Sequence, residues 1–269
     1  MNDAPIDRLR RVLDRLTPAA IAVSGGVDST ALALVAHRQQ PDSFAMIHAI
    51  SAAVPAAAGG RLRALARREG WRLEVIDAGE FDDPDYRANP VNRCFYCKTN
   101  LYRTIAKRAR MTILAGTNCD DLGDFRPGLD AARDHGVRHP YVEAGLDKAA
   151  VRAIAAALGF ERLAALPAAP CLSSRVETGI AIEPELLRAI HGAERLVGRA
   201  LKAATVRCRL RRGGAVIELD TQSLLRLDAN RRAALAVLIA RRFARAGQTL
   251  SVDFAPYRMG SAFLRVPPT

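Results

Sequence analysis

The segment Ser24-Gly25-Gly26-Val27-Asp28-Ser29-Thr30 decides the fold class of this 269-residue chain. It follows the short apolar stretch Ala19–Val23, which predicts a strand, and it leads into Ser29–Gln39, which predicts a helix. The two glycines permit a tight turn and a close approach of the backbone to an anion. Unpaired N–H groups at the start of the helix would then bind a phosphate group. An ordinary glycine turn between a strand and a helix is the alternative interpretation.

Asp28 is an acidic residue at the place where the phosphate is expected. A Mg²⁺ ion between its carboxylate and the phosphates would explain this position, because Mg²⁺ prefers oxygen ligands. The segment is not a Walker A loop, since no Gly-Lys-Ser/Thr follows. We therefore assign Asp28 a catalytic role through the metal, and we expect six residues of the segment to bind ATP: Ser24, Gly25, Gly26, Asp28, Ser29 and Thr30.

Strands and helices alternate through the first part of the chain. Further strands are predicted at Phe44–Ile50, Leu73–Ile76 and Thr112–Ala115, and further helices at Gly60–Glu69, Asn100–Ala109 and Lys148–Leu158. This order is typical of an α/β fold with a mostly parallel sheet and helices on both faces. Ligands of such sheets bind beyond the carboxyl ends of the strands.

A second ATP-binding segment is predicted after the strand at Thr112–Ala115. Gly116-Thr117-Asn118 follows this strand end, so it is expected beside the glycine loop. Farther along, Asp121 and Asp124 either add to the Mg²⁺ site or orient Arg126, a candidate phosphate ligand. A solvated acidic loop is the alternative.

The pattern changes near Val176, and a small α+β domain is expected from there on. Its predicted elements are a helix at Pro184–Val197, strands at Thr205–Leu210, Ala215–Leu219 and Leu250–Phe254, and a helical region at Thr221–Ala246 that is broken near Asp228. We predict an ATP-binding domain at residues 1–175 and a domain for substrate binding or oligomerisation at residues 176–269.

The net charge of +12 comes from 40 Lys/Arg and 28 Asp/Glu residues. Residues 176–269 contain 16 Lys/Arg against 8 Asp/Glu, so this region is the more strongly attracted to anions. Arg207 and Arg209 lie on one face of a predicted strand, which suits a phosphate or a carboxylate. A solvated sheet face is the alternative. Cys208 alternates with these arginines and is expected in the core.

Five cysteines without a secretion signal argue against a disulfide framework. Cys94 and Cys97 form a CxxC before a predicted helix, and Cys171 could supply a third thiolate. Zinc needs four ligands, and no second CxxC or His pair is evident. Three thiolates suit a [4Fe–4S] cluster with one open iron. Two unrelated thiols, and a Cys171 that only packs, are the alternatives.

The chain contains no apolar stretch of about 18 residues, so no membrane span is expected. The N-terminal residues lack an apolar signal core, and their apolar residues follow one face of a helix. We therefore expect a cytoplasmic protein.

The glycine loop resembles the signature of the N-type ATP pyrophosphatases, or PP-loop enzymes, which have an adenine nucleotide alpha-hydrolase-like fold. In these enzymes a substrate oxygen attacks the α-phosphorus of ATP, pyrophosphate leaves, and a nucleophile then displaces AMP. Further segments narrow the resemblance: Asn89–Lys98, Gly116–Leu129, Pro170–Arg175 and Tyr257–Ser261. Together with the glycine loop, and in the same order along the chain, these segments resemble the ATP-dependent sacrificial sulfur transferase (LarE) family. That family takes part in the biosynthesis of the nickel-pincer cofactor of lactate racemase.

The resemblance implies ATP and Mg²⁺ as cofactors and a pyridinium dicarboxylic acid mononucleotide as substrate. The ring carboxylates would be adenylated and then converted to thiocarboxylates. In the family, the cysteine that matches Cys171 gives up its sulfur and becomes dehydroalanine, whereas some members hold a cluster with three cysteines. Cys94, Cys97 and Cys171 favour the [4Fe–4S] version. The resemblance also implies a homo-oligomer.

Five residues are expected to bind the substrate, two of them because of the resemblance and three because of their position in the sequence. Glu194 and Arg258 match family positions on the substrate side of the site. Arg175 directly follows the Cys171 loop and is a candidate phosphate ligand, together with Arg207 and Arg209. The chain departs from the family where Val176–Ile180 replaces an aromatic-Gly-Thr-Pro run.

A tRNA-thiolating enzyme is the second hypothesis, because such enzymes use the same loop and often a three-cysteine cluster. The positive charge suits RNA. The scarcity of aromatic residues for base stacking, and the lack of an added RNA-binding domain, disfavour tRNA as the partner. A non-catalytic nucleotide- or metal-binding protein, and an amidotransferase fed by free ammonia, are further alternatives.

Overall fold

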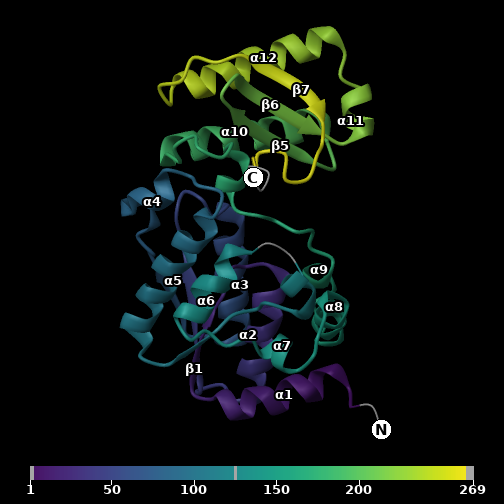
Figure 1. Ribbon diagram of the computed structural model, residues 1–269. Helices are drawn as coiled ribbons and strands as arrows, with labels where there is room; N and C mark the ends of the chain where they lie inside the picture. Colours follow the sequence, from purple (N-terminus) through teal and green to yellow (C-terminus); the bar gives the residue numbers. More distant parts are fainter. Residues whose placement is uncertain (1–2, 124–125, 265–269) are drawn as a thin grey trace. The chain divides into compact units, whose positions relative to one another are not determined.

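The chain forms two compact units in the computed structural model, which describes residues 3–123 and 126–264 (Figure 1). The first unit comprises Met1–Ser51, Ala56–Glu80 and Cys94–Ala169, and the second comprises Ala52–Pro55, Phe81–Arg93 and Pro170–Thr269. The domain boundary between residues 175 and 176 stays a prediction. Among the described helices, none combines the length and the apolarity that crossing a bilayer requires.

A four-stranded parallel sheet forms the centre of the first unit, with the strand order β3-β2-β1-β4. Its strands are β1 (Ala19–Ala22), β2 (Phe44–Ala49), β3 (Leu73–Ile76) and β4 (Thr112–Leu114). In β1, Ala19 is aligned with Phe44 on one side and with Thr112 on the other. Because β1 and β4 are parallel neighbours, the segments that follow them emerge at the same edge of the sheet.

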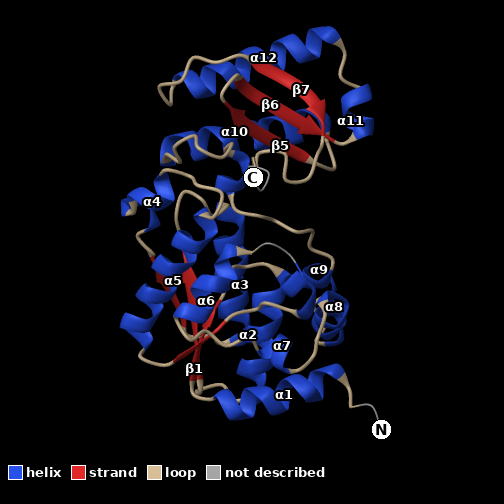
Figure 2. Ribbon diagram, in the orientation of Figure 1, coloured by secondary structure: helices blue, strands red, loops and turns tan. Residues whose placement is uncertain are grey.

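Helices cover both faces of this sheet, as the α/β prediction requires (Figure 2). Ala19 and Ile21 share an apolar cluster with α1 (Pro5–Leu16), α2 (Val27–Gln39) and α8 (Lys148–Ala157). Ala20 points the other way and shares a cluster with α5 (Arg93–Ala109) and α6 (Pro127–Asp134). α3 (Ala56–Glu69) adds Leu62 and Ala66 to the first cluster. The other helices of the unit are α7 (Pro140–Glu143), α9 (Glu161–Ala164) and η2 (Cys119–Gly123), and η1 (Glu80–Asp82) begins at the last residue of a first-unit segment.

The second unit is an α+β fold with a three-stranded sheet in the order β5-β6-β7. β5 (Val206–Arg211) and β6 (Gly214–Leu219) form the predicted antiparallel hairpin, and β7 (Val252–Pro256) pairs with β6 in parallel. The helices of the unit are α10 (Pro184–Leu201), α12 (Ala229–Ala244), α4 (Pro84–Arg87), α11 (Thr221–Leu225) and η3 (Leu172–Arg175). Ile190, Ile217 and Ile239 are fully buried in its core.

The structure corrects the start of one helix and confirms the break in another. α5 begins at Arg93 rather than Asn100, so the CxxC lies in the first turn of a helix and not before it. The Arg93 N–H donates to the carbonyl of Pro90 at 3.0 Å, which winds the chain into the helix earlier than its composition predicts. The break near Asp228 is confirmed, because the Asp228 side chain caps α12 by accepting the Arg231 N–H at 2.8 Å.

Candidate active site

The glycine loop connects the end of β1 to the first turn of α2. Ser29 Oγ accepts the Ser24 N–H at 3.0 Å and lies 3.0 Å from Ser24 Oγ, which closes the turn. Gly25 has a φ of 82°, a conformation that residues with side chains rarely adopt. The Thr30 N–H donates to the Gly26 carbonyl at 3.2 Å, so helical bonding begins within the loop. This arrangement places a helix N-terminus at the sheet edge where an anion would bind.

The carboxylate of Asp28 is held by two residues that are distant in the sequence. Lys148 Nζ contacts its two oxygens at 2.6 and 2.5 Å, and Asn118 Nδ2 donates to Oδ1 at 3.4 Å. The two charged side chains are partly exposed, at 26% for Asp28 and 34% for Lys148. A cation therefore already balances Asp28 at the position where the sequence predicts Mg²⁺.

Lys148 and Tyr141 are site residues that the sequence interpretation missed. The Tyr141 hydroxyl donates to the Asp28 carbonyl at 2.9 Å from a fully buried ring. Burial, and secondly the charge of Asp28, raise the pKa of Tyr141 well above its ordinary value, so the phenol stays a neutral donor. No spacing rule connects either residue with the loop. The only local signal is the position of Lys148 at the start of a helix.

Gly116-Thr117-Asn118 lies beside the glycine loop, as the strand order predicts. A Cβ atom on Gly116 would lie 2.6 Å from the Ser29 nitrogen and 2.9 Å from the Asp28 carbonyl carbon, so only glycine permits this approach. Asn118 is buried, and its carboxamide reaches Asp28. The two segments that were predicted to bind ATP are thus in direct contact within the first unit.

Asp121 orients Arg126, which was one of its two predicted roles. Its Oδ1 lies 2.9 Å from Arg126 Nη2, and its Oδ2 accepts the Asn118 N–H at 3.1 Å. Asp124 lies outside the described residues. Over residues 3–123 and 126–264, no three His, Cys, Asp or Glu side chains gather in a way that could hold a metal ion. A role of Asp121 as a Mg²⁺ ligand stays a prediction.

All five cysteines are thiols without disulfide bonds in the structure. Cys94 and Cys97 occupy the first turn of α5 in the first unit, three residues apart, so they share one side of the helix. Cys171 is exposed and precedes η3 in the second unit. Cys208 is fully buried in β5, as predicted, and burial raises the pKa of its thiol. Cys208 is therefore an inert core residue.

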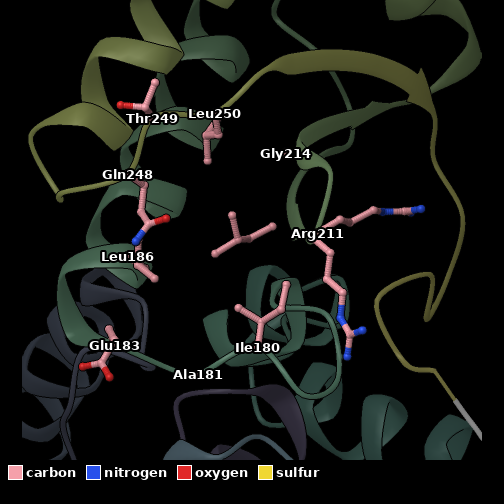
Figure 3. A pocket seen from close by; sticks show the side chains of 11 residues that line it. Ile180, Ala181, Glu183, Leu186, Arg211, Gly214, Gln248, Thr249 and Leu250 are labelled. Atoms are coloured by element: carbon pink, nitrogen blue, oxygen red, sulfur yellow. The ribbon is translucent and has the colours of Figure 1, made fainter.

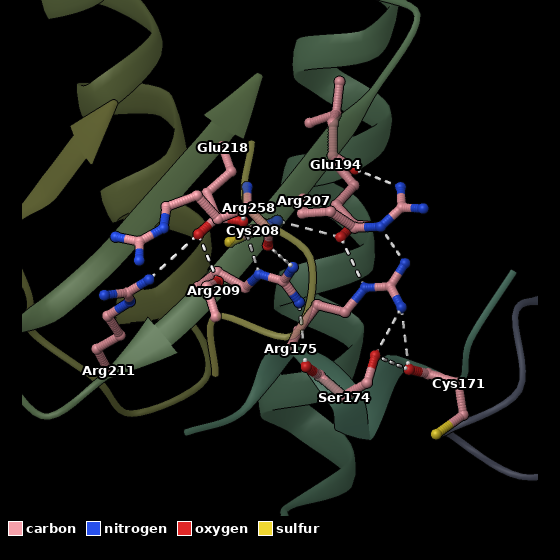
Figure 4. A network of polar contacts seen from close by, with 12 residues as sticks. Cys171, Ser174, Arg175, Glu194, Arg207, Cys208, Arg209, Arg211, Glu218 and Arg258 are labelled. Atoms are coloured by element: carbon pink, nitrogen blue, oxygen red, sulfur yellow. Dashed lines mark hydrogen bonds and ion pairs between the residues drawn. The ribbon is translucent and has the colours of Figure 1, made fainter. Parts of the chain in front are cut away.

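Arg175 connects the Cys171 loop to α10 within the second unit (Figure 4). Its Nη1 donates to the carbonyls of Pro170 at 2.7 Å and Cys171 at 3.0 Å. Its Nε donates to Glu194 at 3.0 Å, and the same carboxylate accepts the Cys208 N–H at 3.1 Å. Arg175 is buried, so this bridge fixes the backbone that presents the Cys171 thiol.

Glu218 is the centre of a second ion-pair group in the same unit. It is 1% exposed and accepts from Arg209 Nε at 2.9 Å, Arg211 Nη2 at 3.1 Å and Ser261 Oγ at 2.5 Å. Arg209 also donates to the carbonyl of Arg258 at 3.1 Å. Glu218 was not predicted as a site residue. Arg258 contacts this group only through its backbone, and its side chain is exposed.

Arg207 differs from its neighbours because it has no ion pair with a carboxylate among the described residues. Its Nη1 donates to the Val206 carbonyl at 2.8 Å, and its guanidinium lies 5.8 Å from the Tyr257 ring centre. Partial burial, and secondly the charge of Arg175, lower the pKa of Arg207. A half-buried cation beside other cations gains stability from a bound anion.

A cavity of about 390 Å³ lies elsewhere in the second unit (Figure 3). It is bounded by the start of α10, the turn of the β5–β6 hairpin and the segment before β7, with Leu186, Arg212 and Leu250 among its lining residues. None of the predicted substrate residues lines it. Arg211 is shared between this cavity and the Glu218 group.

Comparisons with known proteins place the chain in a family. No protein-family model matches it. An uncharacterised protein of Synechocystis is 36% identical over 228 residues, which cover 83% of this chain and 84% of that protein. The chain belongs to the family of this Synechocystis protein.

Two further proteins are more distantly similar to this chain. Pyridinium-3,5-bisthiocarboxylic acid mononucleotide synthase of Lactiplantibacillus plantarum is 28% identical over 212 residues, covering 77% of this chain and 76% of the synthase. An uncharacterised protein of Methanocaldococcus jannaschii is 29% identical over 136 residues, covering 49% of this chain and 52% of that protein. The name of the synthase is that of an enzyme, so the present chain has a distant relative that is named for a reaction.

Proposed function

We propose that the protein is an ATP-dependent sulfur transferase, which adenylates the carboxylates of a pyridinium dicarboxylate mononucleotide and converts them to thiocarboxylates. The bridge from Arg175 to Cys171 and Glu194 is the observation that carries this proposal. It joins the backbone of the residue that bears an exposed thiol to a group of arginines within one compact unit. The distant similarity to the synthase supports the substrate class.

The glycine loop would support the first half-reaction. An oxygen of the substrate carboxylate attacks the α-phosphorus of ATP, the bond from this phosphorus to the bridging oxygen breaks, and pyrophosphate leaves with the electron pair. The amide groups at the start of α2 would bind the phosphates. Lys148 would offset the charge of Asp28 and of the phosphates beside it.

A Mg²⁺ ion would be held by the partly exposed carboxylate oxygens of Asp28, which it would share with Lys148, because Mg²⁺ prefers oxygen ligands. When bound, Mg²⁺ would neutralise phosphate charge during pyrophosphate release.

The charges of the second unit suit the anionic substrate. Four guanidinium groups lie near two carboxylates, so the group carries an excess of positive charge: Arg175, Arg207, Arg209 and Arg211 against Glu194 and Glu218 (Figure 4). Three of these arginines, Arg175, Arg209 and Arg211, form internal ion pairs, which makes Arg207 the first candidate for the phosphate or a ring carboxylate of the substrate.

The thiols fit a [4Fe–4S] cluster in number and chemistry, because three thiolates leave one iron open. Cys94, Cys97 and Cys171 would be its ligands, and the cluster would supply a replaceable sulfide. A second version uses Cys171 alone, which the exposure of this residue permits. Its thiolate would attack the adenylated carbonyl and displace AMP. Loss of the Cα proton and cleavage of the Cβ–S bond would then leave dehydroalanine and a thiocarboxylate.

The test is incubation of the anaerobically purified protein with MgATP and the pyridinium dicarboxylate mononucleotide. We expect pyrophosphate, AMP and a product in which sulfur replaces oxygen, as seen by mass spectrometry. Salt-sensitive binding of tRNA, with pyrophosphate release that depends on tRNA, would instead support the RNA-thiolating alternative.

A further inference from the structure

The start of α3 packs directly on the glycine loop of the first unit. A Cβ atom on Gly25 would lie 3.1 Å from both the Cβ and the carbonyl oxygen of Ala58. One turn later, Arg61 Nη2 donates to the Gly25 carbonyl at 3.3 Å. The loop is therefore contacted by α3 at Gly25 and by Lys148 at Asp28, with a cationic side chain in each place.

Arg61 is not committed to an internal ion pair. Its side chain is exposed, and no carboxylate among the described residues lies within ion-pair distance of it. The first turn of α3 contains no acidic residue. A guanidinium has five N–H donors, and the Gly25 carbonyl uses only one of them.

We propose that Arg61 binds the β- and γ-phosphates of ATP, the part that leaves as pyrophosphate. This inference rests on the proposed function. Lys148 is paired with Asp28, whereas Arg61 meets only a neutral carbonyl at the loop. Negative charge grows on the leaving pyrophosphate as its bond to the α-phosphorus breaks, so a cation there stabilises the transition state. The planar guanidinium also matches the geometry of phosphate oxygens.

A purely structural role of Arg61 predicts a different pattern of binding. Support of the Gly25 carbonyl would affect the shape of the loop, and every nucleotide would bind less well without it. Contact with the β- and γ-phosphates would affect ATP and pyrophosphate but not AMP, which lacks both groups. Comparing these three ligands therefore separates the two roles.

The experiment is titration calorimetry of the full chain with MgATP, magnesium pyrophosphate and AMP. The variants are Arg61→Gln, which keeps a donor for the Gly25 carbonyl, Arg61→Lys, which keeps the charge, and Arg67→Gln. Arg67 is an exposed arginine of the same helix and serves as the control. Thermal unfolding of each variant checks that the fold is intact.

We expect Arg61→Gln to weaken ATP and pyrophosphate binding roughly tenfold or more, as for loss of a charge-assisted hydrogen bond, and to leave AMP binding unchanged. Arg61→Lys should restore part of the loss, and Arg67→Gln should bind like the wild type. Equal weakening of all three ligands, or no weakening by Arg61→Gln, would overturn the inference alone. A wild-type protein that binds neither ATP nor pyrophosphate would overturn the proposed function, and the inference with it.

Discussion

Lys148 contacts both carboxylate oxygens of Asp28, at 2.6 and 2.5 Å, across 120 residues of sequence. The pair joins the first turn of α8 to the first turn of α2 on the same face of the parallel sheet. Both side chains are partly exposed, so the pair contributes little to folding. Because the pair lies at the glycine loop, we propose that it serves phosphate binding.

Replacing Lys148 should affect ATP binding more than stability. We expect Lys148→Met to weaken ATP binding roughly tenfold, because one charge-assisted contact is lost. The free energy of unfolding should change by less than about 1 kcal/mol. Lys107→Met is the matched control, since Lys107 is an exposed lysine of α5. Unchanged ATP affinity in Lys148→Met, measured by calorimetry, would show that the pair has no part in the nucleotide site.

A methyl group at Gly116 should disrupt the loop, because it would lie 2.6 Å from the Ser29 nitrogen. We expect Gly116→Ala to cost about 1–3 kcal/mol of stability and to abolish ATP binding. Gly60→Ala is the control. Gly60 lies inside α3 with no atom near an added Cβ, so this change should stabilise the protein by about 0.5–1 kcal/mol. Chemical denaturation measures both effects. A Gly116→Ala protein that is stable and binds ATP would refute the close approach.

The sequence was sufficient to predict the glycine loop because all its determinants are local. A strand, two glycines and a helix start follow one another there, and the parallel order of β1 and β4 brings Asn118 to Asp28. Lys148 could not be predicted, since a lysine at the start of a helix is usually solvated. Its role depends on the packing of α8 against α2, which no local pattern encodes.

Strand alternation predicted the face of Arg207 and Arg209 but not their different surroundings. The register places Arg207 opposite Glu218 in the hairpin. The Glu218 carboxylate nevertheless bonds the diagonal Arg209, together with Arg211 and Ser261. Burial of Glu218 requires several donors at once, and these come from β5 and from the segment after β7. A pattern read along one strand contains no information about such partners.

Arg209 and Arg207 should therefore behave as a structural and a substrate-binding residue, respectively. We expect Arg209→Gln to cost about 2–4 kcal/mol of stability, because it removes a partner of buried Glu218. Arg207→Gln should cost less than about 1 kcal/mol. It should weaken binding of the pyridinium mononucleotide roughly tenfold or more. Chemical denaturation measures the stability of both variants, and calorimetry measures their binding of the mononucleotide. A large loss of stability in Arg207→Gln, with weak binding confined to Arg209→Gln, would contradict these roles.

The three cysteines can be tested by metal analysis. We expect anaerobic purification to give a brown protein that contains about four iron and about four sulfide ions per chain. Cys94→Ser should lose the iron, whereas Cys208→Ala should keep it, because Cys208 is a core residue. A colourless anaerobic protein that still transfers sulfur, with the mass of Cys171 changed to that of dehydroalanine, would reject the cluster and establish Cys171 as the donor.

Pyrophosphate release is the measurement that tests the central claim most directly. It should be followed in the wild type and in Asp28→Asn, with MgATP and with or without the pyridinium dicarboxylate mononucleotide. Asp42→Asn, which changes an exposed aspartate of the same unit, is the control. We predict release that depends on the mononucleotide, a loss of roughly a hundredfold or more in Asp28→Asn, and normal release in Asp42→Asn. Release of ADP and phosphate instead, or release that is equal in Asp28→Asn and the wild type, would contradict an adenylating enzyme at the glycine loop.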